Sequence, residues 1–319
     1  MMSHKIREFT GSNADYTDCI NLYNKAWPEY RRSEKVFRFN DSSRNPKYLF
    51  KRLLLEQDQC LVGYVEYMEE WESEEDGDYF AMFSVDPKAS FASTADSLLA
   101  AIVTDIRSLN GTRLSTIAIE DRVEEKSYLE TNGFTFTMRE PRSELDVNTF
   151  DFSRFAQLED KLTAGGVEIT NLSNLKDRFP DWQRRAYDLE WPIVQDIPTP
   201  FPVKREPFED FIKLFDHPNY MPESDFYALE GDQWVGLANV RRIDGDPKHM
   251  TVGLTGILPS HRRRGIATAL KIKTVEFAQQ YGAKLIRTDN EENNPMYGLN
   301  LQLGFEPKPA MLNYELKLD

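Results

Sequence analysis

Apolar residues in the second half of the chain alternate between helical and strand-like spacing, and this pattern predicts a series of short elements. The segment FEDFIKLF places Phe208, Phe211, Ile212 and Phe215 three and four positions apart, which is typical of an amphipathic helix. The runs DFYALEG and QWVGLANVRRI predict two strands, because both are rich in apolar, β-branched and aromatic residues. The Gly-Asp pair between them predicts a hairpin turn.

The last third of the chain continues this alternation. A strand, MTVGLTGIL, is followed by an arginine-rich loop, by the helix GIATALKIKTVEFAQQYG, which we expect to stop at Gly282, and by the strand KLIRTDN. A final helix, NPMYGLNLQL, and a final strand, AMLNYELKL, close the series. Before the hairpin, KDRFPDWQRRAYDLEW predicts a helix that ends at Pro192, and the proline-rich passage after it cannot form regular helix or a central strand.

The first half of the chain repeats the landmarks of the second half in the same order. The segments NKAWPEY, CLVGYVEY and YLETNGFTF correspond to DLEWPIV, QWVGLANV and NLQLGFEP. Equivalent landmarks stand 164 to 173 positions apart, in the pairs Trp27 and Trp191, Gly63 and Gly236, Val85 and Ile257, and Gly133 and Gly304. We therefore expect two copies of one domain, residues 1–150 and 151–319, each an α+β structure with a mixed, mostly antiparallel twisted sheet flanked by helices.

The charge balance narrows the classes of function. The chain carries 39 Lys and Arg against 53 Asp and Glu, with a formal net charge of −14. This acidity argues against a nucleic-acid partner, because phosphates require a basic face. An acidic run at residues 69–78 is interpreted as a solvated hairpin tip, with a docking patch for a basic partner as the alternative. The two cysteines, Cys19 and Cys60, are too few for a disulfide framework or a zinc site, so we expect no metal.

Hydropathy gives no sign of a membrane partner. No apolar run approaches the ~18 residues of a membrane span, and the start MMSHKIREFT lacks the apolar segment of a signal peptide. The sequence therefore predicts a cytoplasmic protein, either a monomer or a homodimer.

The loop RRRGIA, residues 262–267, concentrates positive charge where a strand gives way to a helix. Backbone N–H groups of a helix N-terminus point to the same place, so they converge there with the arginine side chains. Gly265 lets the backbone approach a ligand without a Cβ in the way. A solvated basic helix start is the alternative, but the helix dipole disfavours cations there unless an anion binds. The loop therefore favours a phosphate site.

The spacing Arg262-x-x-Gly265-x-Ala267 resembles the pyrophosphate-binding motif of the GNAT superfamily of acetyl-CoA-dependent acyltransferases. The segment TDNEENNPMYGLNLQLGF is similar to that family's closing segment, in which an asparagine begins a helix that ends in Gly-Phe. Together with the internal repeat, the resemblance covers nearly the whole chain. It implies a tandem GNAT protein that uses acetyl-CoA as its cosubstrate.

The resemblance assigns cofactor contacts to the second copy. The backbone of Ile257 and Leu258 would bind the pantetheine arm and present an N–H group to the thioester oxygen. Asn293 matches the asparagine that contacts the cofactor arm, and a helix cap before Pro295 is an equally good interpretation. The pyrophosphate would be held by Arg262, Arg263, Arg264, Gly265, Ile266 and Ala267.

One family feature is missing from the closing segment. Many members carry a tyrosine four positions before the glycine of Gly-Phe, where it protonates the departing thiolate, and here that position is Asn300. Tyr297 lies one turn earlier on the same helix face and can reach the thiolate, with a packing role as the alternative. A thiolate of pKa about 8.5 is a tolerable leaving group, so a missing acid does not exclude transfer.

Acyl transfer to an amine also needs a base, because a primary amine arrives protonated. The strand MTVGLTGIL carries no carboxylate, and the candidates are Asp188, Glu190 and Asp196, which flank the expected acceptor cleft. The alternative interpretation is that each is an ordinary surface carboxylate. His249 is a further candidate, with an exposed hairpin position as the alternative.

The first copy departs from the family motif. Arg262 and Gly265 correspond there to Ser90 and Ser93, and we expect Ser93 or Thr94 to cap the following helix instead. The first copy is therefore predicted to be a degenerate domain and the second to bind acetyl-CoA. The whole chain is predicted to acetylate the primary amine of a small molecule, with a non-catalytic acyl-CoA-binding protein as the alternative.

Overall fold

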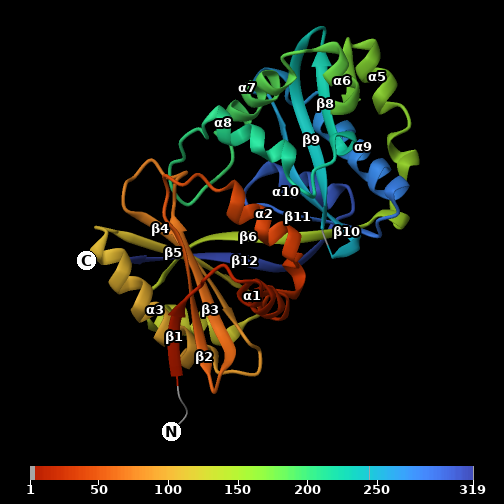
Figure 1. Cartoon of the computed structure of the whole chain (residues 1–319). Coiled ribbons are helices and arrows are strands. Elements are labelled where there is room, and N and C mark those ends of the chain that lie inside the picture. The colour runs from red at the N-terminus through yellow and green to blue at the C-terminus, as the bar shows by residue number, and fades with distance from the viewer. Residues whose placement is uncertain (1–3, 244, 319) are drawn as a thin grey trace. The chain divides into compact units, whose positions relative to one another are not determined.

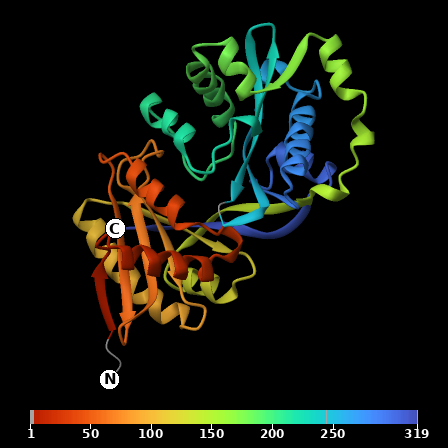
Figure 2. The ribbon, with the colours of Figure 1, turned by 45° about the vertical axis from the view of Figure 1, so that its right-hand side comes forward.

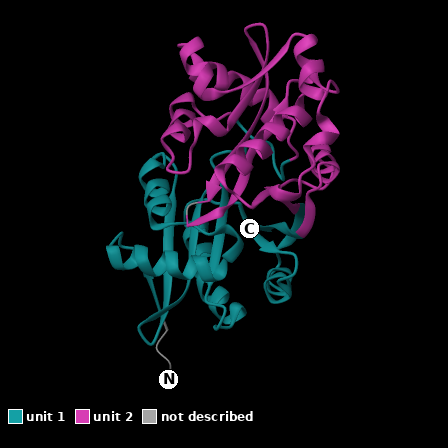
Figure 3. Cartoon of the chain, turned by 90° about the vertical axis from the view of Figure 1, so that its right-hand side faces the viewer, with its two compact units in different colours: residues 1–140, 199–204, 309–319 teal, residues 141–198, 205–308 magenta. Residues whose placement is uncertain are grey.

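The structure is a computed structural model that describes residues 4–243 and 245–318. Residues 1–3 lie outside the described residues. They begin the segment MMSHKIREFT, in which we expect no signal peptide. No helix in the described part of the chain is long and apolar enough to cross a membrane. The chain divides into unit 1, residues 1–140, 199–204 and 309–319, and unit 2, residues 141–198 and 205–308 (Figure 3).

Unit 1 is built on a sheet with helices on both faces. Strands β1 to β4 pair antiparallel in order, β4 and β5 pair in parallel, and β5 pairs antiparallel with β12. Its strands, in order across the sheet, are β1 (His4–Glu8), β2 (Phe50–Gln57), β3 (Cys60–Glu69), β4 (Asp78–Val85), β5 (Arg113–Ile119), β12 (Glu306–Lys317) and β6 (Thr135–Asp146). One face carries α1 (Asn13–Ala26) and α2 (Glu34–Ser43), and the other carries α3 (Phe91–Ser108) and α4 (Val123–Thr131) (Figure 2).

Unit 2 has the same plan. Its sheet pairs β10 and β11 in parallel and the other neighbours antiparallel, in the order β6, β11 (Leu285–Asp289), β10 (Asp246–Ile257), β9 (Gln233–Ile243), β8 (Asp225–Glu230) and β7 (Val167–Asn171). Its helices are α5 (Leu158–Ala164), α6 (Leu172–Arg178), α7 (Trp182–Val194), α8 (Phe208–Phe211), α9 (Ile266–Tyr281) and α10 (Pro295–Gln302). The core on one face is built around α9 and the core on the other around α6, α7 and α8 (Figure 1). The expected α+β class is confirmed.

The landmark residues of the repeat occupy equivalent places in the two sheets. Gly63 on β3 pairs with Val85 on β4, and Gly236 on β9 pairs with Ile257 on β10. A Cβ added to Gly63 would lie 2.4 Å from the side chain of Thr94, and one added to Gly236 would lie 2.4 Å from that of Ile257. Close packing therefore requires a glycine at both places, which explains why both copies have one.

The last strand of each copy pairs with the sheet of the other copy. Residues 311–317 of β12, which we expected to close the second copy, pair antiparallel with β5 in unit 1. Residues 142–146 of β6 pair antiparallel with β11 in unit 2. The units therefore differ from the continuous halves that the repeat predicts, and residues 199–204 of the proline-rich passage also belong to unit 1.

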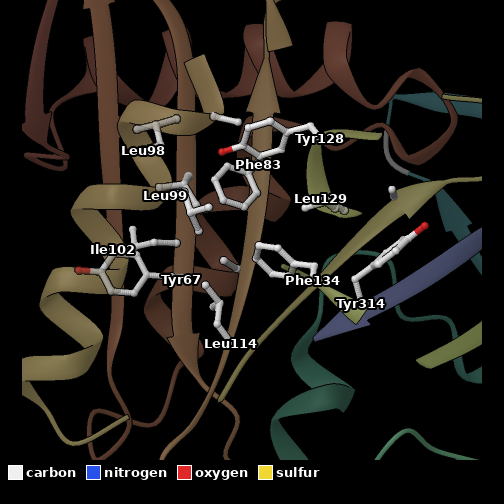
Figure 4. Packing of buried hydrophobic residues seen from close by; sticks show 14 of the residues in the cluster. Tyr67, Phe83, Leu98, Leu99, Ile102, Leu114, Tyr128, Leu129, Phe134 and Tyr314 are labelled. Atoms are coloured by element: carbon white, nitrogen blue, oxygen red, sulfur yellow. The ribbon is translucent and has the colours of Figure 1, made fainter. Parts of the chain in front are cut away.

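The exchanged strand β12 contributes to the core of unit 1. Tyr314 is 2% exposed and lies in the same cluster as Leu114 of β5 and Phe134 (Figure 4). Burial of a large apolar side chain contributes about 1.5–3 kcal/mol, so the final strand stabilises the unit formed mainly by the first half of the chain.

Two element boundaries differ from the expected ones around the prolines. The segment expected to form one helix contains two, α6 and α7, because Pro180 disfavours helical backbone at Phe179, where ψ is 100°. Pro192 lies inside α7, which continues to Val194, so the helix does not end at the proline. Pro192 has no N–H group, so α7 lacks one backbone hydrogen bond near its end. The helix tolerates this loss because the neighbouring Ile193 packs in the core.

The acidic run at residues 69–78 is not a free hairpin tip. Residues 199–204 pair with it through a β-bridge between Ser73 and Val203. Asp78 is 2% exposed. Part of the run is therefore structural, and its expected solvation applies only to the outermost carboxylates.

Lys271 of α9 is a buried cation with no carboxylate partner among the described residues. Lys271 is only 2% exposed, and its Nζ lies 5.3 Å from the ring centre of Phe305. Burial lowers the pKa of Lys271 to about 7. The unfolded chain keeps this proton up to about pH 10.4, so the folded state binds it more weakly, and stability rises with pH between these two values.

We predict that Lys271→Met raises the free energy of unfolding near neutral pH, because it removes the cost of keeping this amine in an apolar site. The difference between the two proteins should shrink by on the order of 2 kcal/mol between about pH 7.5 and about pH 9.5. In this range the unfolded wild type binds the proton and the folded wild type does not, so the cost of releasing it on folding falls as the pH rises. Urea unfolding of both proteins at the two pH values measures this. A difference that does not change with pH would show that Lys271 keeps its proton in the folded state.

Candidate active site

Strands β10 and β11 of unit 2 are parallel but pair over three residues only. The pairs join His249–Thr251 to Leu285–Arg287, although β10 continues to Ile257. In the second half of β10, backbone groups on the β11 side therefore have no partner from that strand. An extended ligand arm can bind there, because a strand edge offers regularly spaced donors and acceptors.

Asn239 of β9 holds the irregular part of β10. The register between the two strands shifts between Val252 and Thr255, which marks a bulge. The Leu254 N–H group donates to Asn239 Oδ1 over 3.0 Å, and a Cβ at Gly253 would lie 2.3 Å from the same oxygen. A glycine and an asparagine together fix the bulge beside the gap between β10 and β11.

Ile257 and Leu258 stand where β10 ends. The Leu258 N–H group donates to the Val235 carbonyl oxygen over 2.9 Å, so it is used within the sheet. Along an antiparallel strand, successive N–H groups point to opposite sides, and the Ile257 N–H group therefore points away from β9, toward the gap. Of the two expected oxyanion donors, the Leu258 N–H group is used within the sheet and the Ile257 N–H group faces the gap.

Helix α9 begins at Gly265 with uncapped backbone donors. Gly265 is the N-cap residue, with φ of 83°, and no side chain bonds the N-terminus of this 16-residue helix. Ile266 and Ala267 are its first two residues. A side chain at position 265 would be strained by the positive φ, and its Cβ would lie 3.0 Å from Leu158. This N-terminus is thus open to an anion.

Carboxylates bind two of the three arginines of the loop. Arg262 forms an ion pair with Asp196, and Arg264 Nη2 lies 2.8 Å from Glu230 Oε1. Arg263 is exposed, has φ of 61°, and forms no ion pair with a described residue. The two pairs show that Arg262 and Arg264 are placed to bind oxyanions, and a phosphate would compete with Asp196 and Glu230 for them.

Sequence reasoning missed Glu230, which ends β8 and holds the arginine loop. His261 Nε2 lies 3.0 Å from Glu230 Oε2, so the carboxylate binds both His261 and Arg264. Hydrogen bonds from Arg264 and then His261 lower the pKa of Glu230. The Gly-Asp turn marks the end of β8 in the sequence, but no local pattern indicates that this residue reaches the loop.

Glu190 of α7 lies near a buried charged pair that the sequence did not indicate. Asp225 of β8 is 1% exposed and forms an ion pair with Arg241 of β9. Burial raises the pKa of Glu190 to about 7; Arg241 opposes this shift and Asp225 adds to it. Glu190 can therefore gain or lose a proton near neutral pH, whereas Asp196 is held in its ion pair with Arg262.

Asn300 and Tyr297 differ sharply in their surroundings on α10. Asn300 is completely buried, and its Nδ2 donates to Asn290 Oδ1 over 2.6 Å, which ties α10 to the residue after β11. An amide cannot serve as a proton donor of the required acidity, so the structure gives Asn300 a positioning role. Tyr297 is half-buried, and its hydroxyl makes no hydrogen bond to a described residue.

Asn293 does not cap α10. The N-cap residue is Asn294, whose side chain accepts from the Met296 N–H group over 2.9 Å, with Pro295 as the first helical residue. Asn293 instead binds Glu291 through its backbone N–H group and its Nδ2, both over 2.8 Å. The helix-cap interpretation of Asn293 is wrong, because the cap lies one position later.

The corresponding place in unit 1 is closed by a side chain. Ser90 is the N-cap of α3, and its Oγ accepts from the Ser93 N–H group over 3.4 Å, so the expected caps Ser93 and Thr94 lie inside the helix. The strands of unit 1 repeat the three-residue parallel pairing, between Asp78–Phe80 and Arg113–Ser115. The two units therefore share the gap and differ at the helix N-terminus.

Comparisons with known proteins agree with this geometry. Residues 185–305 match the model of the Acetyltransferase (GNAT) family. No curated protein matches the sequence. A tandem GNAT protein from the clavulanic acid biosynthesis pathway is 15% identical over 99% of both chains, with a TM-score of 0.75. A GCN5-related N-acetyltransferase from Sphaerobacter thermophilus is 13% identical over 99% of this chain and 96% of that one, with a TM-score of 0.71.

A third solved structure has the same fold within a larger protein. The GCN5-related glucosamine N-acetyltransferase region of a fungal multi-domain GH3 β-N-acetylglucosaminidase is 10% identical over 98% of this chain and 38% of that one, with a TM-score of 0.71. At these identities the structural matches establish the fold, and the family match falls on the copy that carries the arginine loop. The whole chain has the fold of the solved tandem GNAT structure, and residues 185–305, in its second half, match the acetyltransferase (GNAT) family model.

Proposed function

We propose that this chain is an N-acetyltransferase that moves the acetyl group of acetyl-CoA to the primary amine of a small molecule, with the cofactor held by unit 2. The observation that carries the proposal is the position of the uncapped N-terminus of α9, directly after the unpaired half of β10. These two features offer donors for a diphosphate and an edge for an extended amide-containing arm in one continuous stretch.

The residues around the loop fit a diphosphate. Arg262 and Arg264 already bind carboxylates, which present the same kind of oxyanion as a phosphate. Gly265, Ile266 and Ala267 begin the helix with backbone donors that no side chain occupies. In this proposal, Ile257 supplies the N–H group for the thioester oxygen, and Asn293 contacts the cofactor arm.

Glu190 is our candidate for the base and Tyr297 for the acid. Glu190 accepts a proton from the ammonium group of the acceptor, and the freed lone pair attacks the thioester carbonyl carbon. The tetrahedral intermediate loses the second proton of its nitrogen to water and collapses with cleavage of the carbon–sulfur bond, and Tyr297 protonates the departing thiolate. The raised pKa of Glu190 supports this choice, because a base works best when its pKa is close to the operating pH.

We assign cofactor binding to unit 2 alone. Ser90 fills the helix N-terminus in unit 1 with its own hydroxyl, and no arginine stands beside it in the motif. A diphosphate there would have to displace a cap and would gain no guanidinium contact.

Arg262→Ala should weaken acetyl-CoA binding roughly tenfold, or about 1.5 kcal/mol. This value is at the lower end of the range for a hydrogen bond to a charged group, because the Arg262 side chain is 45% exposed and solvent screens its charge. Binding of pantetheine, which lacks the phosphates, should hardly change. Isothermal titration calorimetry with both ligands measures this. Arg185→Ala is the matched control. It also removes an arginine that forms an ion pair with an exposed aspartate, Asp181, but it lies away from the loop. Equal losses for the two ligands would contradict a diphosphate site at the loop.

Glu190→Gln should lower kcat/KM by about 100-fold or more, the usual contribution of a general base. The wild-type rate should rise with pH through about 7, because only the ionised carboxylate accepts a proton, and the variant should lose this step. Thiol release from acetyl-CoA with glucosamine, spermidine and 2-phenylethylamine as acceptors measures the profile.

Asp188→Asn serves as the control for this experiment, because Asp188 lies on the same helix but pairs with Arg205 at an exposed position. It should keep the wild-type pH profile. No thiol release by the wild type with any amine, combined with tight acetyl-CoA binding, would instead support a non-catalytic acyl-CoA-binding protein.

A further inference from the structure

Unit 1 contains a cavity that the proposed acetyl transfer in unit 2 does not use. Its volume is about 280 Å³, close to the lower end of the usual range for small-molecule pockets, about 300 Å³. Its floor is one face of the sheet, where Phe80 of β4, Ser115 of β5 and Glu315 of β12 stand side by side in register. Thr137 and Pro200 line it and are exposed, so the cavity reaches the surface.

A segment from the proline-rich passage builds one wall of the cavity. Residues 199–204 are held on the acidic run by backbone bonds: the Glu74 N–H group donates to the Pro202 carbonyl over 3.0 Å, and the Lys204 N–H group donates to the Glu72 carbonyl over 2.8 Å. These bonds place Phe201 at the cavity. The wall is therefore a constructed part of unit 1.

The charge of Arg113 in this cavity is already compensated. Its Nε donates to Asp78 Oδ1 over 3.0 Å, and its Nη1 lies 3.6 Å from Glu315 Oε2. The guanidinium carbon also lies 4.8 Å from the ring centre of Phe201. Since two carboxylates and an aromatic face surround this one cation, little attraction remains for an anionic ligand.

Glu70 is the lining carboxylate that remains without an ion pair to any described residue. Its backbone N–H group is fixed by the Asp78 carbonyl over 2.8 Å, which holds the residue at the edge of the cavity. Burial raises the pKa of Glu70 to about 7; Glu72 and Asp78 add to this shift, and Arg113 opposes it. A cation in the cavity would remove the cost of keeping Glu70 ionised there.

We propose that this cavity binds a small primary amine with a flat apolar body, whose ammonium group pairs with Glu70 and whose body lies against Phe80 and Phe201. Aromatic faces favour both parts of such a ligand, because they bury apolar surface and attract cations. Binding here requires no acetyl-CoA and is independent of the reaction assigned to unit 2. The same charges exclude coenzyme A, which carries several phosphates.

The test titrates the full chain, without acetyl-CoA, with 2-phenylethylamine at about pH 8, where Glu70 is ionised, and follows binding by calorimetry. Saturable binding is expected, and Glu70→Gln should weaken it at least about tenfold, as for loss of a charged hydrogen bond. Glu75→Gln is the matched control, since it removes the same charge from an exposed position of the same run. It should bind like the wild type.

Two further arms separate this site from the acceptor site of unit 2. Binding should persist in Glu190→Gln, and 2-phenylethanol, the neutral analogue, should bind at least about tenfold more weakly than the amine. The affinity of the wild type should fall as the pH drops below about 7, because Glu70, surrounded by Glu72, Asp78, Arg113 and Glu315, then takes up a proton.

Four results would each overturn the proposal. Two concern the variants: unchanged amine binding in Glu70→Gln, or loss of binding in Glu190→Gln. The other two concern the wild type: equal binding of the amine and the alcohol, or no amine binding at all. If Glu70→Gln fails to fold, as judged by its thermal unfolding, Phe201→Leu provides the test. It keeps the apolar wall but removes the aromatic face, and it should weaken the amine more than the alcohol.

Discussion

The interruption of the parallel ladder after Thr251 is the constraint on which the candidate active site of unit 2 depends. Backbone groups inside a sheet need partners, and the second half of β10 lacks those that β11 would supply. The bulge held by Asn239 lies along this unpaired half, and the chain then turns at Gly265 into α9. Unpaired strand and uncapped helix therefore follow one another within a few residues, and one extended ligand can satisfy both.

The two copies have kept this sheet geometry and diverged at the start of one helix. In unit 1, Ser90 satisfies the helix N-terminus from within the chain; in unit 2, Gly265 leaves the equivalent donors to a ligand. A difference of a few residues thus separates a helix N-terminus that is capped from within the chain from one that is left open. Unit 1 instead has a cavity elsewhere on its sheet, walled by Phe201 from the second copy's sequence.

Local sequence patterns predicted most helices and strands, but they did not predict contacts between distant segments of the chain. Helix α9 ends at Gly282, and the repeat places Val85 and Ile257 in equivalent register, as the sequence indicated. The pairing of β12 with β5 was missed, because alternating apolar residues show that a strand exists but not which neighbour it has. The contact of Glu230 with the arginine loop and the burial of Glu190 were unpredictable for the same reason, since both depend on distant segments.

The exchange of β12 gives the protein an order of assembly during its synthesis. The open edge of β5 is complete in the nascent chain long before residues 311–317 leave the ribosome, so unit 1 must wait for the second copy to be translated before its sheet can close. A chain without residues 311–317 leaves this edge of β5 without its partner strand, and an open strand edge is a template for pairing with another chain.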